Sequence, residues 1–306
     1  MTLSVIVGTK YRPADLERML ATLTSQTHLP QEAIIVDQSN GDETRRVIER
    51  FVRDLKVAGH DEPEIVHVYD PTLVGAGAAR NVGVERSRGE ILVFLDDDVL
   101  LEPEFLHELL RVYQEYPEAG GVSGVVTNYP LPPRSARILR RLFWTGPFHD
   151  ERQPLYWRAD RLRDHEPIRV RRLASNVMSI RREALADDRF DHFYRGTGAE
   201  DVDLTWRIHE RCPLLIAPRA RLFHVRSKAG REAEDWIRQD ALYNYYLYHR
   251  LWRKGVVNRL CFAWLNCGYA LLACAGSVRR LSLRPWQSFL QGRRSGLERA
   301  YLDGKK

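Results

Sequence analysis

The sequence predicts an α/β fold with a mostly parallel central sheet flanked by helices, followed by a basic helical region. Two observations carry this prediction. Short apolar segments rich in β-branched residues alternate with segments whose apolar residues recur at helical spacing. Strands that are apolar on both faces and alternate with helices are typical of parallel sheets with both faces covered.

The charge distribution supports a separate C-terminal region. The 306 residues sum to +6, but residues 241–306 contain twelve Lys or Arg and only two acids, a net of +10. Residues 1–240 therefore sum to −4. A basic region of this kind favours an anionic surface as partner. A nucleic-acid-binding protein would instead need a basic stripe on the folded domain, and the acidic balance of residues 1–240 argues against it.

The first half of the chain supplies the alternating pattern. We expect strands at 3–9, 32–39, 64–70 and 91–98, and helices at 14–26, 42–55, 75–89 and 102–116. Ligands of such sheets bind beyond the carboxyl ends of the strands. We therefore expect Thr9, Asp37, Asp70 and the run Asp96–Asp98 to lie along one edge of the sheet.

The second half is predicted to be less regular. Residues 130–182 are rich in Arg and are predicted to form a loop-rich insertion, with a strand near its end at 177–180. A glycine-containing loop then enters a helix whose first turn holds Glu200, Asp201 and Asp203. Residues 213–226 are expected to contain a final strand pair that ends in His224.

The apolar run 260–278 lies between basic flanks. It is borderline in length for a spanning helix and is interrupted by Asn266 and two glycines. Basic flanks on both sides favour a helix that lies in a membrane interface. The residues expected to dock there are Trp252, Phe262, Trp264, Tyr269, Leu271, Leu272 and Trp286. A dimerisation or packing helix is the alternative interpretation.

The run Asp96–Asp98 follows a buried strand. A D-x-D arrangement at a strand end can place alternate carboxylates around a divalent cation, and oxygen ligands suit Mg²⁺ or Mn²⁺. A solvated acidic turn is the alternative interpretation. The segment 75–81, "GAGAARN", does not indicate a dinucleotide site, because Arg80 occupies the third glycine position and the segment follows a late strand.

Five segments, in order along the first 230 residues, carry a family resemblance: "SVIVGTKYR" at 4–12, "AIIVDQSNGDET" at 33–44, "GAGAARNVGVERSRGEILVFLDDDV" at 75–99, "GTGAEDVDLTWRI" at 196–208 and "FHVRS" at 223–227. The chain resembles family 2 glycosyltransferases, inverting enzymes of the GT-A fold. The resemblance implies a catalytic domain at 1–230, with a donor-binding half at 1–125 and an acceptor half at 126–230. Residues 231–306 would be a basic helical region.

The resemblance also implies roles for individual residues. Asp201, in the E-D pair, would be the general base, and Glu200 and Asp203 would contact the acceptor. The metal ligands would be Asp96, Asp98 and His224. The donor contacts would be Thr9, Arg12, Asp37, Arg80, Asp96 and Asp97. Alternatives remain open at several positions: an Asx turn at Asp37, a surface charge at Arg12, local ion pairs at Arg80 and a structural His224.

The function implied is a metal-dependent, inverting transfer of a hexosyl or deoxyhexosyl group. The donor would be a UDP-, GDP- or dTDP-sugar, the cofactor Mn²⁺ or Mg²⁺, and the acceptor a hydroxyl of a glycan or lipid-linked molecule. We expect a cytoplasmic enzyme of bacterial cell-surface polysaccharide or glycolipid synthesis that is peripheral to the inner face of the membrane. It would bind the membrane through residues 250–294 and would not bind nucleic acid. A nucleotidyltransferase of related fold is the alternative.

Overall fold

The computed structural model describes residues 1–57, 63–194, 199–227 and 236–303. Their contacts divide the chain into two compact units. One unit comprises residues 1–130 and 151–231 and is called the sheet unit here. The other comprises residues 131–150 and 232–306 and is called the helical unit.

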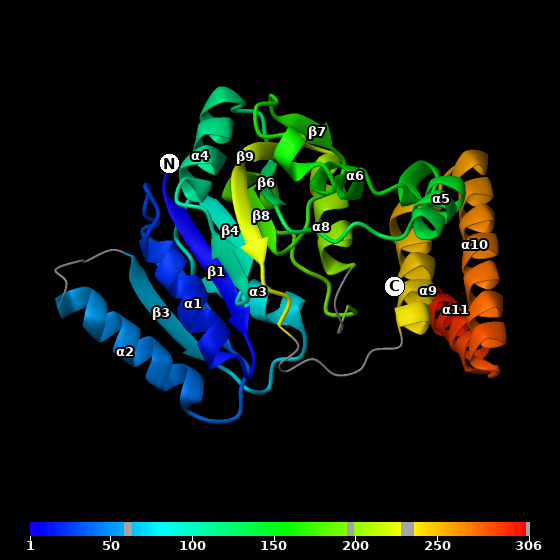
Figure 1. The fold of residues 1–306 in the computed structure, drawn as a ribbon, viewed down its shortest axis with the longest axis horizontal. Coiled ribbons are helices and arrows are strands. Elements are labelled where there is room, and N and C mark those ends of the chain that lie inside the picture. Colours follow the sequence, from blue (N-terminus) through cyan, green and yellow to red (C-terminus); the bar gives the residue numbers. More distant parts are fainter. Residues whose placement is uncertain (58–62, 195–198, 228–235, 304–306) are drawn as a thin grey trace. The chain divides into compact units, whose positions relative to one another are not determined.

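The sheet unit is built on one sheet of nine strands (Figure 1). The strands are β1 (Leu3–Thr9), β2 (Glu32–Asp37), β3 (Glu64–Tyr69), β4 (Ile91–Asp96), β5 (Val99–Leu101), β6 (Gly121–Val126), β7 (Ile168–Val170), β8 (Val177–Arg181) and β9 (Leu214–His224). The order along the sheet is β3-β2-β1-β4-β8-β6-β9-β5, and β7 pairs with β9. The helices are α1 (Pro13–Thr24), α2 (Glu43–Val57), α3 (Ala76–Arg86), α4 (Phe105–Glu115), α6 (Arg152–Tyr156), α7 (Arg182–Leu185) and α8 (Glu200–His209), with a 3₁₀ turn at Ala159–Arg161.

The alternating first half of the sequence folds as expected. Strands β3, β2, β1 and β4 are mutually parallel, and β1, β2 and β4 are almost entirely buried because both faces of the sheet are covered. The second half is mixed, since β8 runs antiparallel to β4 and β6, and β9 is parallel to β6. The strand pair expected at 213–226 is wrong: one long strand, β9, occupies this segment.

The register of the strands determines which residues lie together at the functional edge of the sheet. Thr9 lies opposite Asp37, Gly8 opposite Asp96, and Asp37 opposite Tyr69. The last residues of β1, β2 and β4 therefore lie side by side at the carboxyl edge. Helix α3 packs close against β1, because a Cβ at Gly83 would meet Ile6 Cγ2 at 2.2 Å. The glycine at 83 thus serves helix packing on the sheet.

The helical unit consists of α5 (Arg134–Phe143), a 3₁₀ turn at Gly146–Phe148, α9 (Trp236–Leu247), a π-helical turn at Tyr248–Trp252, α10 (Val256–Arg280) and α11 (Arg284–Asp303) (Figure 1). Small residues let these helices approach closely. A Cβ at Gly268 of α10 would lie 2.6 Å from the Phe143 ring, and one at Gly292 of α11 would lie 2.2 Å from the Arg238 carbonyl. Residues 131–150, expected in the acceptor half of the first domain, pack in this unit. The predicted domain boundary at 230/231 stays a prediction.

Several aromatic residues expected on a membrane-facing surface belong instead to the core of this unit. Trp252 and Tyr269 are buried. Phe262 stacks on Tyr248 with the ring centroids 3.9 Å apart. Trp264 and Leu271 are exposed, as expected. The helix thus sorts its apolar residues into an inner, aromatic-lined face and a separate outer face.

Candidate active site

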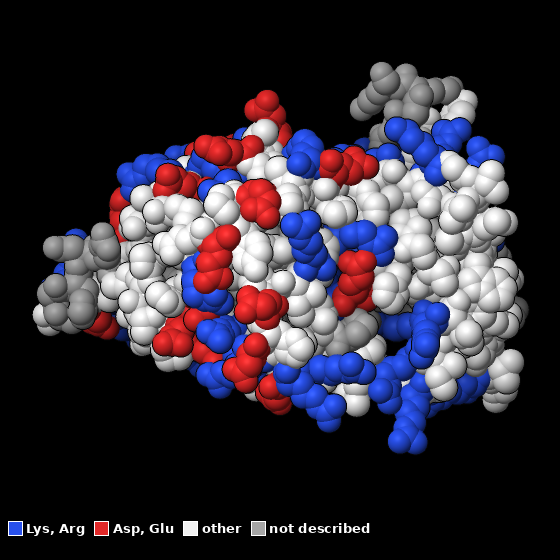
Figure 2. All heavy atoms as spheres, turned by 90° about the horizontal axis from the view of Figure 1, so that it is seen from above, with Lys and Arg blue, Asp and Glu red and all other residues white. Residues whose placement is uncertain are grey.

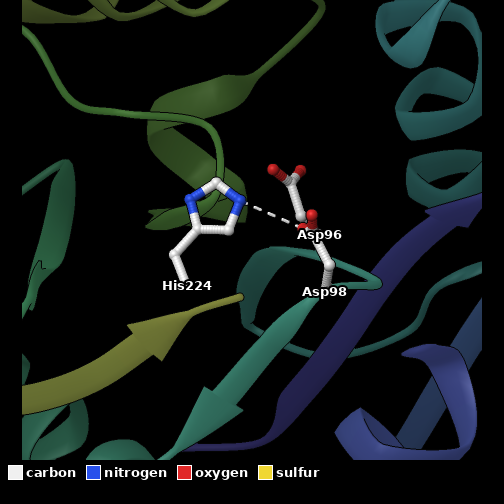
Figure 3. Close-up of side chains that lie close together, drawn as sticks. All are labelled: Asp96, Asp98 and His224. Atoms are coloured by element: carbon white, nitrogen blue, oxygen red, sulfur yellow. Dashed lines mark hydrogen bonds and ion pairs between the residues drawn. The ribbon is translucent and has the colours of Figure 1, made fainter. Parts of the chain in front are cut away.

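The carboxylates of Asp96 and Asp98 and the ring of His224 converge at the carboxyl edge of the sheet (Figure 3). Each offers one ligand atom, and these atoms lie within 4.8 Å of one another. Asp96 is the last residue of β4, and Asp98 lies in the turn after β4. His224 is the last residue of β9, a strand that is not adjacent to β4 in the sheet. Two carboxylates and one imidazole form a donor set that fits a divalent cation such as Mn²⁺.

Neighbouring groups fix the geometry of this cluster. The His224 Nε2 atom lies 3.1 Å from Asp98 Oδ1, and Asn176 Nδ2 lies 3.1 Å from His224 Nδ1. If the side-chain amide of Asn176 were flipped, its oxygen would face a protonated His224 Nδ1, and His224 Nε2 would be free to bind a cation. The backbone N–H of Ser227 donates to Asp98 Oδ2 at 2.8 Å. Burial alone would raise the pKa of Asp98, but the His224 contact and Arg12 hold it below its usual value.

Asp97 points away from this cluster into the protein. Its Oδ2 accepts from Thr9 Oγ1 at 2.7 Å, and its Oδ1 accepts from Arg12 Nη1 at 3.0 Å. Burial raises the pKa of Asp97 to about 7, against the opposing effects of Arg12 and Thr9. Side chains alternate in direction along Asp96–Asp98, as expected. The Asp97 side chain, however, contacts β1 and the loop that follows β1. A donor contact of Asp97, Thr9 or Arg12 stays a prediction.

Asp37 ends β2 with its carboxylate fully buried. Its Oδ1 accepts from the backbone N–H of Ser39 at 2.9 Å, which is the Asx turn left open above. Its Oδ2 lies 3.5 Å from His67 Nε2, and both of these buried atoms lack a hydrogen-bond partner among the described residues. Burial would raise the pKa of Asp37, and His67 and Ser39 more than reverse this effect. The sequence analysis did not identify His67.

Arg80 is buried and joins two parts of the site. Its guanidinium donates to Asp96 Oδ1 at 3.1 Å and to Glu200 Oε1 at 3.0 Å, and it lies over the Phe190 ring. The neighbouring Asn81 side chain exchanges two hydrogen bonds with the Phe190 backbone. The Arg-Asn pair of α3 therefore has mainly an internal role here. These contacts are the local ion pairs given as the alternative at Arg80, and a donor contact of this residue stays a prediction.

The acidic residues at the start of α8 also contact other residues of the protein. Asp201 Oδ2 lies 3.3 Å from Arg152 Nη1 and accepts from the Ser175 N–H at 3.2 Å. Glu200 faces Arg80, and Asp203, fully buried, faces Arg207 of its own helix at 2.9 Å. The structure thus places Glu200 and Asp203 in internal ion pairs, and an acceptor contact of either residue stays a prediction. Residues 195–198 of the preceding glycine-containing loop lie outside the described residues.

Two further residues were missed by sequence reasoning. Arg152 lies in the segment predicted to be a loop-rich insertion, and only the fold brings it to Asp201. Tyr11 adopts φ +57°, a conformation that is uncommon outside glycine, and its N–H donates to Ser39 Oγ at 2.8 Å. This bond connects the loops that follow β1 and β2. Nothing in the local sequence of either residue signals these contacts.

Residues 4–183 match the family model described as glycosyl transferase family 2. The chain belongs to this family. It is 28% identical over 232 residues to a validoxylamine A glucosyltransferase of Streptomyces hygroscopicus subsp. limoneus, an alignment that covers 68% of this chain and 48% of that protein. A glucosyl-dolichyl phosphate glucuronosyltransferase of Haloferax volcanii is 29% identical over 128 residues, covering 41% of this chain and 38% of that one. The chain spans about half the length of the validoxylamine A glucosyltransferases that it matches.

Solved structures agree on the fold. S. aureus TarS 1–349 in complex with UDP-GlcNAc superposes with a TM-score of 0.62 at 16% identity, covering 95% of this chain and 79% of TarS 1–349. The mannosyltransferase PcManGT of Pyrobaculum calidifontis, in complex with GDP-Man and Mn²⁺, gives a TM-score of 0.58 at 18% identity, covering 98% and 87%. The predicted GT-A fold with C-terminal helices is confirmed.

Proposed function

We propose that this family 2 member is an inverting glycosyltransferase that uses a nucleotide-sugar donor and a divalent cation. The observation that carries the proposal is the convergence of Asp96, Asp98 and His224 beside the helix start that holds Asp201. Arg80 connects the two, since it bonds both Asp96 and Glu200. The sugar-nucleotide and Mn²⁺ complexes of the structural relatives support the donor class and the cation.

Donor binding would use the row of strand ends. Asp37 Oδ2 and His67 Nε2 lie 3.5 Å apart and make no hydrogen bond to a described residue, so both are suited to hydrogen-bonding groups of a nucleoside. Asp96, Asp98 and His224 would hold the cation, which, when bound, neutralises the charge that develops on the departing diphosphate. Arg80 holds the Asp96 carboxylate, and His224 and the Ser227 N–H hold that of Asp98, so little reorganisation is needed on binding.

Transfer would use Asp201 as general base. Its carboxylate takes the proton of the acceptor hydroxyl while that oxygen forms a bond to the anomeric carbon. The bond from the anomeric carbon to the diphosphate oxygen breaks on the opposite face, and the nucleoside diphosphate leaves with the electron pair. Arg152 and the Ser175 N–H orient the base. One displacement inverts the anomeric configuration without a covalent intermediate on the protein.

A donor panel tests this proposal. UDP-, GDP- and dTDP-sugars, with nucleoside triphosphates as controls, are added to the chain with Mn²⁺, and the rise in melting temperature and release of nucleoside diphosphate are measured. We expect one sugar nucleotide to raise the melting temperature and to be consumed, and EDTA to remove both effects. Consumption that persists without divalent cation would refute the role of the cluster, and a response to triphosphates alone would favour a nucleotidyltransferase.

A further inference from the structure

The outward face of α10 is apolar along most of its length. The exposed positions from 260 to 278 carry no charged residue; they are Leu260, Ala263, Trp264, Cys267, Leu271, Cys274, Ala275 and Val278. Val278 is 75% exposed and Leu260 is 65% exposed. A helix on the surface of a soluble protein normally turns polar residues outward. The pattern of α10 is the reverse, so a partner for this face is expected.

A second helix extends this face. The indole N–H of Trp264 donates to the carbonyl of Leu142 in α5 at 2.6 Å, and Leu142 and Ile138 expose more than half of their surface. The apolar strip, defined here as these exposed residues of α5 and α10, runs about 27 Å along α10. Contiguous exposed apolar area of this extent marks an interaction site.

Basic residues lie at both ends of the strip. Arg253, Lys254 and Arg259 lie near its first residue, and Arg279, Arg280 and Arg284 lie near its last. Within the described part of the chain, no ion pair joins any of these six to a carboxylate. On the part of the molecule drawn at the right of Figure 2, the charged side chains are mainly Lys and Arg. Unpaired cations beside exposed apolar surface complement an anionic, apolar partner.

A cavity lies where the last turns of α10 meet α9 and α11. Its volume is about 390 Å³, and its lining residues are Ile237, Leu272, Gly276, Arg279, Arg280 and Pro285. The lining combines apolar residues with two arginines. This combination suits a phosphate group attached to a hydrocarbon chain, because guanidinium groups bind phosphate and the apolar residues shield the chain.

We propose that the helical unit docks on an anionic phospholipid surface, with α10 lying in the interface and a lipid phosphate bound by Arg279 and Arg280. Helix α10 is long and apolar enough to cross a membrane. Its inner face, however, is committed to protein contacts through Leu265, Gly268 and Tyr269, so only one face is free for lipid. A second copy of the chain is disfavoured as occupant, since both ends of the strip are basic and would face like charge. The docking is independent of the transfer reaction proposed above.

Vesicle cosedimentation of the full chain tests the proposal. One vesicle type is phosphatidylcholine alone, and the other has about a third of its lipid replaced by phosphatidylglycerol. We expect binding to the anionic vesicles that weakens with salt. The double variant Arg279→Gln/Arg280→Gln should weaken it about tenfold or more, and Leu271→Gln/Val278→Gln should weaken it through the apolar strip. The matched control is Arg53→Gln/Arg86→Gln, which removes the same charge from the exposed surface of the sheet unit and should bind like the parent chain.

Three results would overturn the proposal. Equal binding to neutral vesicles would exclude the anionic headgroup, and equal loss in the control variant would reduce the effect to net charge. A dimer of the parent chain in light scattering that Leu271→Gln/Val278→Gln converts to a monomer would assign the strip to a second copy.

Discussion

The arginines near the candidate sites of the two units differ in burial and in pairing. In the sheet unit, Arg12, Arg80, Arg152 and Arg207 are largely buried and contact carboxylates. In the helical unit, Arg279 and Arg280 are exposed at the end of α10 and form no ion pair with a described carboxylate. Buried pairs fix the geometry of a site, whereas unpaired surface charges are available to a partner. The same residue type therefore serves positioning in one unit and association in the other.

The largest effect is expected at the candidate base of the sheet unit. Asp201→Asn keeps the shape of the side chain but cannot take a proton from the acceptor hydroxyl. We expect turnover to fall about 10³-fold, with donor affinity little changed, because Asp201 does not belong to the cation cluster. Steady-state kinetics with the donor identified by the panel would measure this loss. Asp187→Asn, an exposed change on the same unit, is the control, and near-normal turnover of Asp201→Asn would exclude the residue as the base.

A pair of arginine substitutions tests the comparison directly. Arg80→Met keeps the bulk of the side chain but leaves Asp96 and Glu200 without their buried partner, so we expect a loss of about 3 kcal/mol in the free energy of unfolding. Arg280→Met removes an exposed and unpaired charge, and a change within about 0.5 kcal/mol is expected. Urea unfolding of both variants measures the two values. Similar losses would show that burial and pairing do not distinguish the units in the way described.

The parallel half of the fold could be predicted from sequence because its signal is local. Strands β1 and β4 are short, largely apolar segments, and α1 repeats apolar residues at helical spacing. The placement of Asp96, Asp98 and His224 in one cluster was anticipated through the family resemblance, which implied these three residues as metal ligands. Contacts that depend on packing between segments distant in the sequence could not be predicted.

Arg152 and Arg80 show that limit. Arg152 reaches Asp201 across 49 positions and Arg80 reaches Glu200 across 120, and no local pattern encodes either pairing. The prediction that Trp252 and Tyr269 face a membrane failed for the same reason, since both residues lie in the core of the helical unit. Composition indicates that a segment is aromatic and basic, but only the packing of α9, α10 and α11 decides which face each ring occupies.

A smaller effect is expected in the pH dependence of the sheet unit, and Asp97 is its source. The pKa of this buried carboxyl is raised to about 7 in the folded chain, whereas an unfolded chain has a value near ~3.9. The folded state therefore binds the proton more tightly. Its contribution to stability is complete below about pH 4, decreases as the pH rises and is lost above about pH 7.

In the presence of EDTA, the free energy of unfolding should fall by about 2 kcal/mol from Asp97 alone between roughly pH 5.5 and 8. The side chain introduced by Asp97→Asn cannot ionise, so the free energy of unfolding of this variant should not show this decrease. As the pH rises, the variant should therefore become more stable relative to the parent chain. Asp98, whose pKa is lowered, changes stability only under more acidic conditions and does not interfere. Urea titrations across this pH range measure both chains. Equal slopes would mean that Asp97 stays ionised beside Arg12, and the pairing of charge within the sheet unit would then be stronger than burial predicts.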